Sequence, residues 1–271
     1  MAILYVVATP IGNLEDISLR ALRILREVSF IAAEDTRKTK RLLDRYEINT
    51  PLISYFEHSK PAKIKLIIDR LESGDAALVS EAGTPGINDP GYELITAAIE
   101  KGIQIVPIPG PSIVVTALSA SGLPTERFLY IGFLPNKPAD RRKVLQSVAG
   151  ETATLVILES PRRIPSSLND IVSVLGDRRI AICREMTKLH EEIYRGAISG
   201  AIVRFQQPRG EFALVIEGSR EKEKPQLTGD ISERLQLLRK SGVPAKEAIA
   251  VIGKETGLSR RELYQKWLSL K

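Results

Sequence analysis

A loop rich in glycine and proline follows a short apolar segment in the first third of the chain, and it strongly restricts the fold. The segment at 75–78 ends in apolar residues, and the loop VSEAGTPGINDPG then covers residues 79–91 with three glycines and two prolines. Residues 92–101 carry apolar side chains at helical spacing, so we expect a strand, a loop and a helix in that order. Such a loop indicates a sharp turn or a close approach to another group. Two interpretations are open: a rigid turn, or one wall of a ligand site at the end of a strand.

Two more loops of the same character follow other expected strands. The sequence TPIGN at 9–13 follows the expected strand 3–8, and PIPGPS at 107–112 follows the expected strand 103–107. None of the three loops matches the GxGxxG or P-loop patterns, which argues against a simple dinucleotide or nucleoside triphosphate site. Three such loops in one half of the chain favour a pocket for a small organic ligand.

Apolar runs that predict strands alternate with segments of helical periodicity through residue 121. The other strands expected in this part cover residues 29–33, 52–55 and 75–78. The expected helices cover residues 19–28, with Asp16 or Ser18 as the cap, and residues 38–46, 61–73, 92–101 and 113–121. This alternation is typical of a parallel, doubly wound sheet with helices on both faces.

A second alternating part is expected after Gly122. Its expected strands cover residues 128–133, 154–158, 179–184, 190–194 and 212–217, and its expected helices cover 137–148, 162–175 and 197–205. The polar run 219–226 is typical of a linker. We therefore expect an α/β domain at 1–122, a second α/β domain at 123–220, a linker at 221–228 and a helical unit at 229–271.

The last segment is basic and helical. Helices are expected at 230–240, 245–256 and 260–270, and residues 229–271 contain nine Lys or Arg against five Asp or Glu. Three short helices with this spacing resemble a helix-turn-helix unit. Two interpretations are open here as well: contacts to nucleic-acid phosphates, or packing of a structural helical unit on the rest of the chain.

Composition excludes several classes of protein. The chain has 271 residues and a net charge of +6, with one cysteine, Cys183, and two histidines, His58 and His190. No disulfide within the chain is possible, no zinc pattern is present, and Cys183 lies in an apolar stretch that favours a buried structural thiol. We expect no metal. No apolar run reaches the roughly 18 to 20 residues needed to span a bilayer, and no signal peptide is evident, so we expect a cytoplasmic protein without membrane contact.

Four segments together resemble the family of ribosomal RNA small-subunit methyltransferase I enzymes, in the tetrapyrrole methylase superfamily. They are TPIGNLEDISLRAL, IAAEDTRKTKRLL, SEAGTPGINDPGYELI and PIPGPSIVVTALSASGLPTERF. The resemblance covers residues 4–217 and continues more weakly into the last helices. It implies two α/β domains of the class III methyltransferase type with a cleft between them, a small helical unit, and a homodimer. The corrin and sirohaem methylases of the superfamily typically carry Gly-Asp-Pro where this chain has Gly83-Thr84-Pro85.

The resemblance also implies an activity, namely transfer of a methyl group from S-adenosylmethionine to the ribose 2′-oxygen of a cytidine in 16S rRNA of the small ribosomal subunit. The residues that it implies as cofactor contacts lie mostly in the three loops: Pro10, Ala82, Gly83, Thr84, Ile87, Ser112, Ile113 and Glu159.

The acceptor hydroxyl must be held in line with the methyl group and must lose its proton. Candidates for this chemistry are the polar residues of EDTR and REMTK: Glu34, Asp35, Arg37, Glu185 and Lys188. The basic cluster of Arg37, Lys38, Lys40 and Arg41 is expected to hold phosphates. An alternative remains open for both groups, because Glu34 and Asp35 can cap the following helix and the basic cluster can be a solvated face.

Two other functions remain as alternatives. One is methylation of a tetrapyrrole of the corrin or sirohaem type, which needs no extended positive surface. The other is a helix-turn-helix nucleic-acid binder whose α/β body senses a ligand without turnover.

Overall fold

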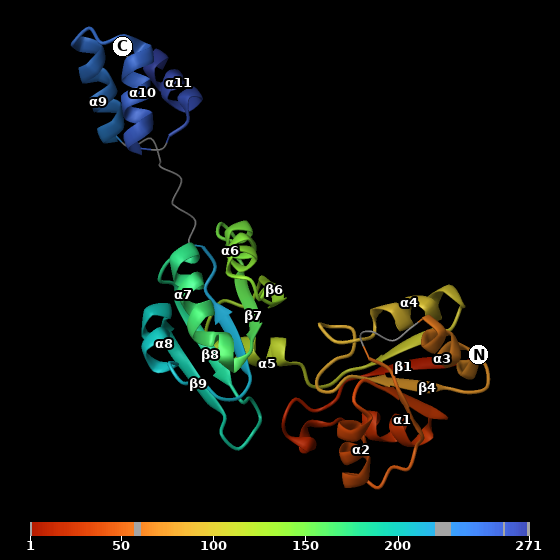
Figure 1. The fold of residues 1–271 in the computed structure, drawn as a ribbon. Helices are drawn as coiled ribbons and strands as arrows, with labels where there is room; N and C mark the ends of the chain where they lie inside the picture. The colour runs from red at the N-terminus through yellow and green to blue at the C-terminus, as the bar shows by residue number, and fades with distance from the viewer. Residues whose placement is uncertain (1, 57–60, 220–228, 257, 270–271) are drawn as a thin grey trace. The chain divides into compact units, whose positions relative to one another are not determined.

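The computed structural model describes residues 2–56, 61–219, 229–256 and 258–269 (Figure 1). The expected linker at 221–228 and His58 lie outside these residues. The chain has two compact units, Met1–Gly218 and Ser219–Lys271. The first unit contains two five-stranded sheets, and the second contains three helices. None of the helices in the described ranges is long and apolar enough to cross a membrane.

The first sheet is parallel throughout, as the alternating pattern predicted, in the order β3-β2-β4-β1-β5. Its strands are β1 Ile3–Val7, β2 Phe30–Ala33, β3 Leu52–Ser54, β4 Ala76–Val79 and β5 Gln104–Ile108. Strand β4 is the central strand and all four of its residues are buried, because helices cover both faces of the sheet. Its carboxyl end leads directly into the glycine- and proline-rich loop.

Two pairs of helices cover this sheet, one pair on each face (Figure 1). They are α1 Leu19–Glu27 and α2 Thr36–Arg45 on one face, and α3 Pro61–Leu71 and α4 Tyr92–Glu100 on the other; a short 3-10 turn, Leu14–Asp16, precedes α1. Ser18 is the N-cap of α1, because its hydroxyl oxygen accepts the Ala21 N–H at 3.1 Å. This bond decides between the two caps expected from the sequence.

The second sheet is mixed, in the order β6-β7-β10-β8-β9, with one parallel pair, β6 and β7. Its strands are β6 Phe128–Phe133, β7 Thr154–Glu159, β8 Arg179–Arg184, β9 Glu192–Ala197 and β10 Phe212–Ile216. Strand β9 begins two residues later than expected because the turn after β8 continues to Glu191, whose N–H donates to the Lys188 carbonyl at 3.1 Å.

Neighbouring residues of β10 point to opposite faces of this sheet, and each face has its own apolar core. One core packs against the helices α6 Pro138–Ser147, α7 Ile164–Leu175 and α8 Ile198–Arg204, with the 3-10 turn Pro161–Arg163 before α7. The other packs against α5, Ile113–Ser121, through Val114, Ala117 and Leu118. Helix α5 thus follows the first sheet in sequence but packs on the second, while a domain boundary near Gly122 stays a prediction.

The second unit consists of α9 Gly229–Lys240, α10 Ala245–Thr256 and α11 Arg260–Ser269. Apolar residues of all three helices form its core, with Leu235, Ile252 and Leu263 fully buried. Ser259 and Glu262 form a capping box before α11, because the Glu262 carboxylate accepts the Ser259 N–H at 3.1 Å and the Ser259 hydroxyl oxygen accepts the Glu262 N–H at 3.3 Å. This unit therefore has an apolar core of its own.

Candidate functional site

A cavity of about 400 Å³ in the first unit is lined by loops of the first sheet and by strands of the second. This volume lies in the range of pockets that hold small organic ligands, roughly 300 to 1,000 Å³. The lining residues of the first half are Ile11, Glu34, Glu81, Ala82, Gly83, Thr84, Ile87, Asn88, Asp89, Ser112, Ile113 and Val114. Those of the second half are Tyr130, Phe133, Leu158, Glu159, Ser160, Pro161, Cys183, Met186, Glu211, Phe212 and Ala213.

The structure joins the three glycine- and proline-rich loops into one wall. Thr9 and Gly83 exchange two backbone hydrogen bonds, at 2.8 and 2.9 Å, which connect the first loop to the second. The Thr84 hydroxyl donates to the Pro111 carbonyl at 3.4 Å, which connects the second loop to the third. Gly83 has a φ of +79°, a conformation that glycine adopts without steric cost. The glycine-rich composition of these loops thus allows their three backbones to approach one another closely.

Seven of the eight residues implied as cofactor contacts line this cavity: Ala82, Gly83, Thr84, Ile87, Ser112, Ile113 and Glu159. The eighth, Pro10, is buried and is not among the lining residues; its neighbour Ile11 lines the cavity instead.

Protein groups surround the Glu159 carboxylate at the end of β7. Its residue is 1% exposed, and it accepts hydrogen bonds from the Ser160 N–H at 2.8 Å and the Ser167 hydroxyl at 2.5 Å. The Arg163 Nε lies 3.2 Å away as its counter-ion. Arg163 also donates to the carbonyls of Leu134 and Pro135, which joins the loop after β6 to the start of α7. Glu159 is therefore a structural carboxylate as well as a lining residue.

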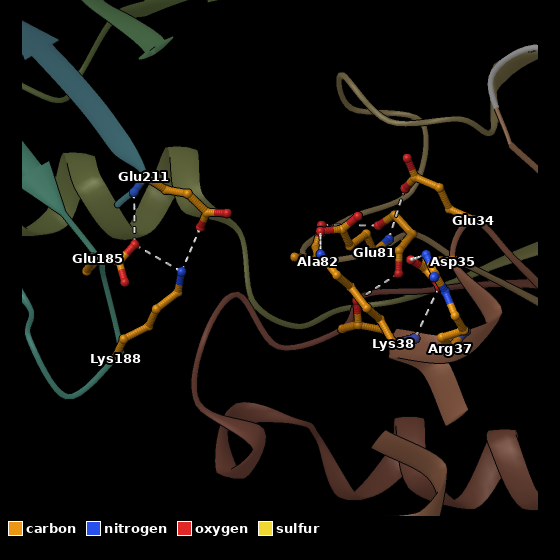
Figure 2. Close-up of polar contacts among 11 residues, drawn as sticks. Glu34, Asp35, Arg37, Lys38, Glu81, Ala82, Glu185, Lys188 and Glu211 are labelled. Carbon is orange, nitrogen blue, oxygen red and sulfur yellow. Dashed lines mark hydrogen bonds and ion pairs between the residues drawn. The ribbon is translucent and has the colours of Figure 1, made fainter. Parts of the chain in front are cut away.

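The EDTR residues have different surroundings (Figure 2). Asp35 is the N-cap of α2, since its carboxylate accepts the backbone N–H groups of Arg37 at 2.8 Å and Lys38 at 3.3 Å. The hydrogen bonds from the Arg37 side chain and backbone hold the pKa of Asp35 below its usual value. Glu34 is not the cap: it lines the cavity and accepts the Glu81 N–H at 2.9 Å. The Arg37 side chain is 89% exposed, and neither Asp35 nor Arg37 lines the cavity.

Glu185 and Lys188 of REMTK form a second network with Glu211 (Figure 2). The Lys188 ammonium lies 3.1 Å from Glu185 and 2.9 Å from Glu211, and Glu185 also accepts the Glu211 N–H at 2.8 Å. Of the three residues, Glu211 alone lines the cavity. The same turn contacts the first loop, because the Asn13 N–H donates to the Thr187 hydroxyl at 3.0 Å.

The charges in this network oppose proton transfer to either expected residue. Burial by itself raises the pKa of Glu185, but hydrogen bonds from the Glu211 N–H and Lys188 outweigh it and hold the pKa below its usual value. Burial lowers the pKa of Lys188, but its bonds to Glu211 and Glu185 more than compensate, and the pKa is raised. At neutral pH Glu185 is thus a weak base and Lys188 stays protonated.

Two family models match the sequence of this chain. The family model described as tetrapyrrole (corrin/porphyrin) methylases matches residues 3–201, and the model described as the RsmI C-terminal HTH domain matches residues 225–271. The chain belongs to the tetrapyrrole methylase family.

Several relatives of this methylase match it almost from end to end, and all carry the name ribosomal RNA small subunit methyltransferase I. The protein from Halalkalibacterium halodurans is 47% identical over 96% of this chain and 93% of its own length. The protein from Synechocystis sp. is 43% identical over 100% and 99%, and that from Escherichia coli O157:H7 is 44% identical over 97% and 93%. Within the family, the methylase belongs to this ribosomal RNA small subunit methyltransferase I group.

Solved structures show the same fold at low sequence identity. A diphthine synthase has a TM-score of 0.62 at 16% identity, over 80% of this methylase and 90% of that chain. A uroporphyrin-III-C-methyltransferase from Thermus thermophilus has a TM-score of 0.58 at 20% identity, over 80% and 94%. These likenesses confirm the expected α/β architecture of the methylase.

Several lining residues of the methylase were not identified from the sequence. Asp89 belongs to the glycine- and proline-rich loop, but the sequence indicated a role only for the backbone of this loop and not for the Asp89 carboxylate. Tyr130, Met186 and Phe212 come from the second half, and no local pattern there indicates a ligand. Cys183 also lines the cavity, yet it is 1% exposed and burial raises its pKa to about 11. The expected burial of this thiol is confirmed.

Charge distinguishes the cavity from the rest of this basic methylase. Five of its described lining residues are acidic, namely Glu34, Glu81, Asp89, Glu159 and Glu211, and none of the described ones is Lys, Arg or His. Lys38, Arg163 and Lys188 pair with three of the five, which leaves Glu34 and Asp89 without an ion pair in the described ranges. This remaining negative charge favours an organic cation over an anion such as a nucleotide phosphate. In the described ranges, no group of three His, Cys, Asp or Glu side chains is placed to hold a metal ion.

Proposed function

We propose that this methylase uses S-adenosylmethionine to methylate the ribose 2′-oxygen of a cytidine in 16S rRNA of the small ribosomal subunit. The observation that carries this proposal is the cavity itself, which combines apolar side chains with five carboxyl groups and, in the described lining, no basic side chain. S-adenosylmethionine carries a sulfonium cation on an organic skeleton, and such a surface suits it. The names of the relatives support ribosomal RNA as the substrate. The ribose 2′-oxygen of a cytidine is what the family resemblance of the four sequence segments implies.

The chain's own residues have two tasks in this reaction. S-adenosylmethionine supplies an activated methyl group when bound. The joined loops around Gly83, Thr84 and Ser112 offer backbone groups and small side chains that can hold this molecule in one orientation. The protein must also place the acceptor oxygen in line with the methyl group and take up its proton.

Basic groups outside the cavity suit the phosphates of RNA. Arg37 projects from the start of α2 with most of its side chain in solvent. The helical unit matched by the HTH model has nine basic against five acidic residues from position 229 onward. We infer that Arg37 and this unit bind the RNA backbone, which needs charge and not base recognition. We further propose a cytoplasmic homodimer, as the family resemblance implies.

The test is methyl transfer to defined substrates. Purified protein is incubated with methyl-labelled S-adenosylmethionine and either small ribosomal subunits that lack the modification or free 16S rRNA from the same subunits. Label in the ribose of one cytidine is the expected result. Label in a base, or in no RNA, would refute the proposal. Label in a porphyrinoid offered separately would establish a tetrapyrrole methylase, and tight DNA binding without turnover would establish the ligand-sensing binder.

A further inference from the structure

Asp89 differs from three of the other four carboxylates of the cavity because it forms no ion pair within the described ranges. Three of the others form ion pairs: Glu159 with Arg163, Glu211 with Lys188, and Glu81 with Lys38. Glu34 accepts a hydrogen bond from the Glu81 N–H. Asp89 accepts a hydrogen bond from the Ser80 hydroxyl, and within the described ranges no Lys, Arg or His forms an ion pair with it. Asp89 and Glu34 are thus the two of the five carboxylates that form no ion pair within the described ranges.

The surroundings of Asp89 favour its protonated form. Burial, the negative charge of Glu34 and, more weakly, that of Glu81 raise its pKa to about 6, against the opposing effect of the Ser80 hydrogen bond. Tyr130 of β6 lines the same cavity, and burial together with the charge of Asp89 raises the pKa of this phenol to about 12. Tyr130 therefore stays protonated, whereas Asp89 can take up and release a proton close to neutral pH.

Chain geometry fixes Asp89 at this place. It lies in the loop between β4 and α4, and the neighbouring Asn88 packs against β6 so closely that a Cβ at Gly132 would collide with the Asn88 amide. Gly132 has a φ of +76° and follows a register shift in the pairing of β6 with β7. The loop that carries Asp89 is therefore seated against the second half of the chain, on the cavity.

We propose that Asp89 is the general base that accepts the proton of the ribose 2′-hydroxyl during methyl transfer. The O–H bond breaks as the O–C bond forms; the S–C bond breaks, and its electron pair returns to sulfur, which leaves as a neutral thioether. The proton resides on the Asp89 carboxyl group and passes to solvent after the product leaves. This inference rests on the proposed function, and it assigns the step to a residue that neither EDTR nor REMTK contains.

The test compares Asp89→Asn with wild type in the full-length chain. We expect single-turnover methyl transfer to small subunits to fall by about 10²- to 10⁴-fold, the usual contribution of a general base. Affinities for S-adenosylmethionine and for its uncharged product S-adenosylhomocysteine, measured by calorimetry, should each stay within about threefold of wild type. Glu93→Gln is the matched control, because it removes an exposed carboxylate four residues away that does not line this cavity; it should react at the wild-type rate.

The pH profile gives a second readout. In wild type the transfer rate should fall about tenfold per pH unit below pH 6, because the base is active only when deprotonated. Ser80→Ala removes the hydrogen bond that lowers the pKa of Asp89, so this limb of the profile should move to higher pH even if Asp89→Asn fails to fold. Glu34, Glu81 and Tyr130 also face Asp89, and they are unchanged in both variants.

Three outcomes would overturn the inference: transfer by Asp89→Asn within threefold of wild type, an unmoved pH limb in Ser80→Ala, or a loss confined to S-adenosylmethionine affinity. The last result would make Asp89 a recognition group for the sulfonium charge. Wild-type protein that transfers no methyl group to RNA would instead refute the proposed function, so the two failures are distinguishable.

Discussion

Replacing Glu159 by glutamine tests whether the carboxylate next to the cavity supports the fold. The side chain of Glu159 is fully buried, and glutamine of the same shape leaves Arg163 without its counter-ion. Removal of one partner from a buried ion pair costs about 3–5 kcal/mol. Arg163 is 22% exposed and keeps its bonds to two backbone carbonyls, which places the loss at the lower end. We expect the free energy of unfolding to fall by about 3 kcal/mol.

Urea unfolding of the full-length chain at pH 7 measures this loss. Circular dichroism follows the whole chain, while fluorescence of Trp267, the only tryptophan, reports on the helical unit. With an m-value of about 2 kcal/mol per molar urea, the transition of the first unit should move down by about 1.5 M, and the fluorescence transition should not move. Asp140→Asn is the control, because its ion pair with Lys143 is exposed and contributes less than about 1 kcal/mol.

The same variant separates structural support from cofactor recognition. A stability loss with unchanged affinity for S-adenosylhomocysteine shows that Glu159 acts through Arg163, and a loss of affinity larger than tenfold supports the contact that the family resemblance implies. If the free energy of unfolding of Glu159→Gln lay within about 1 kcal/mol of wild type, as expected for the control Asp140→Asn, the reasoning from burial and charge would be refuted.

Further predictions concern residues outside the cavity. Arg37→Glu should abolish methylation of small subunits and leave cofactor affinity near normal in calorimetry; a fully active variant would remove Arg37 from the site. Deletion of residues 229–271 should weaken subunit binding in a filter assay and spare cofactor binding, since this unit has its own core; unchanged subunit affinity would make the unit structural. Asp170→Asn leaves the buried Arg141, 4% exposed, without its partner at 2.6 Å and should lower the free energy of unfolding by about 3 kcal/mol at pH 7. Burial raises the pKa of Asp170, but hydrogen bonds from Arg141 and Arg142 lower it more, so the pKa in the folded state lies below the ordinary value of 3.8. In urea titrations, the stability difference between wild type and Asp170→Asn should therefore be complete above pH 3.8 and disappear as the pH falls through the folded-state pKa.

Local patterns in the sequence were sufficient for the first half of the fold. Strand β4, which ends at Val79, is buried on both faces, and such strands show continuous apolar runs that can be recognised without tertiary information. The three loops follow β1, β4 and β5, and the carboxyl ends of parallel strands meet at one edge of a sheet. The parallel sheet expected from the sequence therefore places the three loops at one edge, but the strand order that puts β1 between β4 and β5, and so allows the bridge between Thr9 and Gly83, comes from the structure.

The second half required contacts between distant segments. Strand β10 is last in sequence but lies between β7 and β8, so the alternation of strands and helices does not reveal the mixed sheet. The partner of Lys188 that lines the cavity is Glu211, 23 residues away, and no spacing rule connects them. Asp35 could be recognised as a possible cap from its position before α2, but only the structure separates its role from that of Glu34.

In the proposed function, one chain binds both a cation, S-adenosylmethionine, and an anionic polymer, RNA, and the distribution of its charges is consistent with both. The carboxylates of the cavity repel phosphates, so an RNA strand is favoured there only if its backbone stays outside while a neutral ribose enters. In the proposed function, Arg37, which does not line the cavity, and the basic residues of the helical unit provide the compensating attraction. Asp89 meets the requirement of the chemical step, because its raised pKa lets it become neutral as the hydroxyl proton arrives. Because the proton leaves Asp89 uncharged when the donor loses its own positive charge, the electrostatic balance of the cavity is conserved across the step.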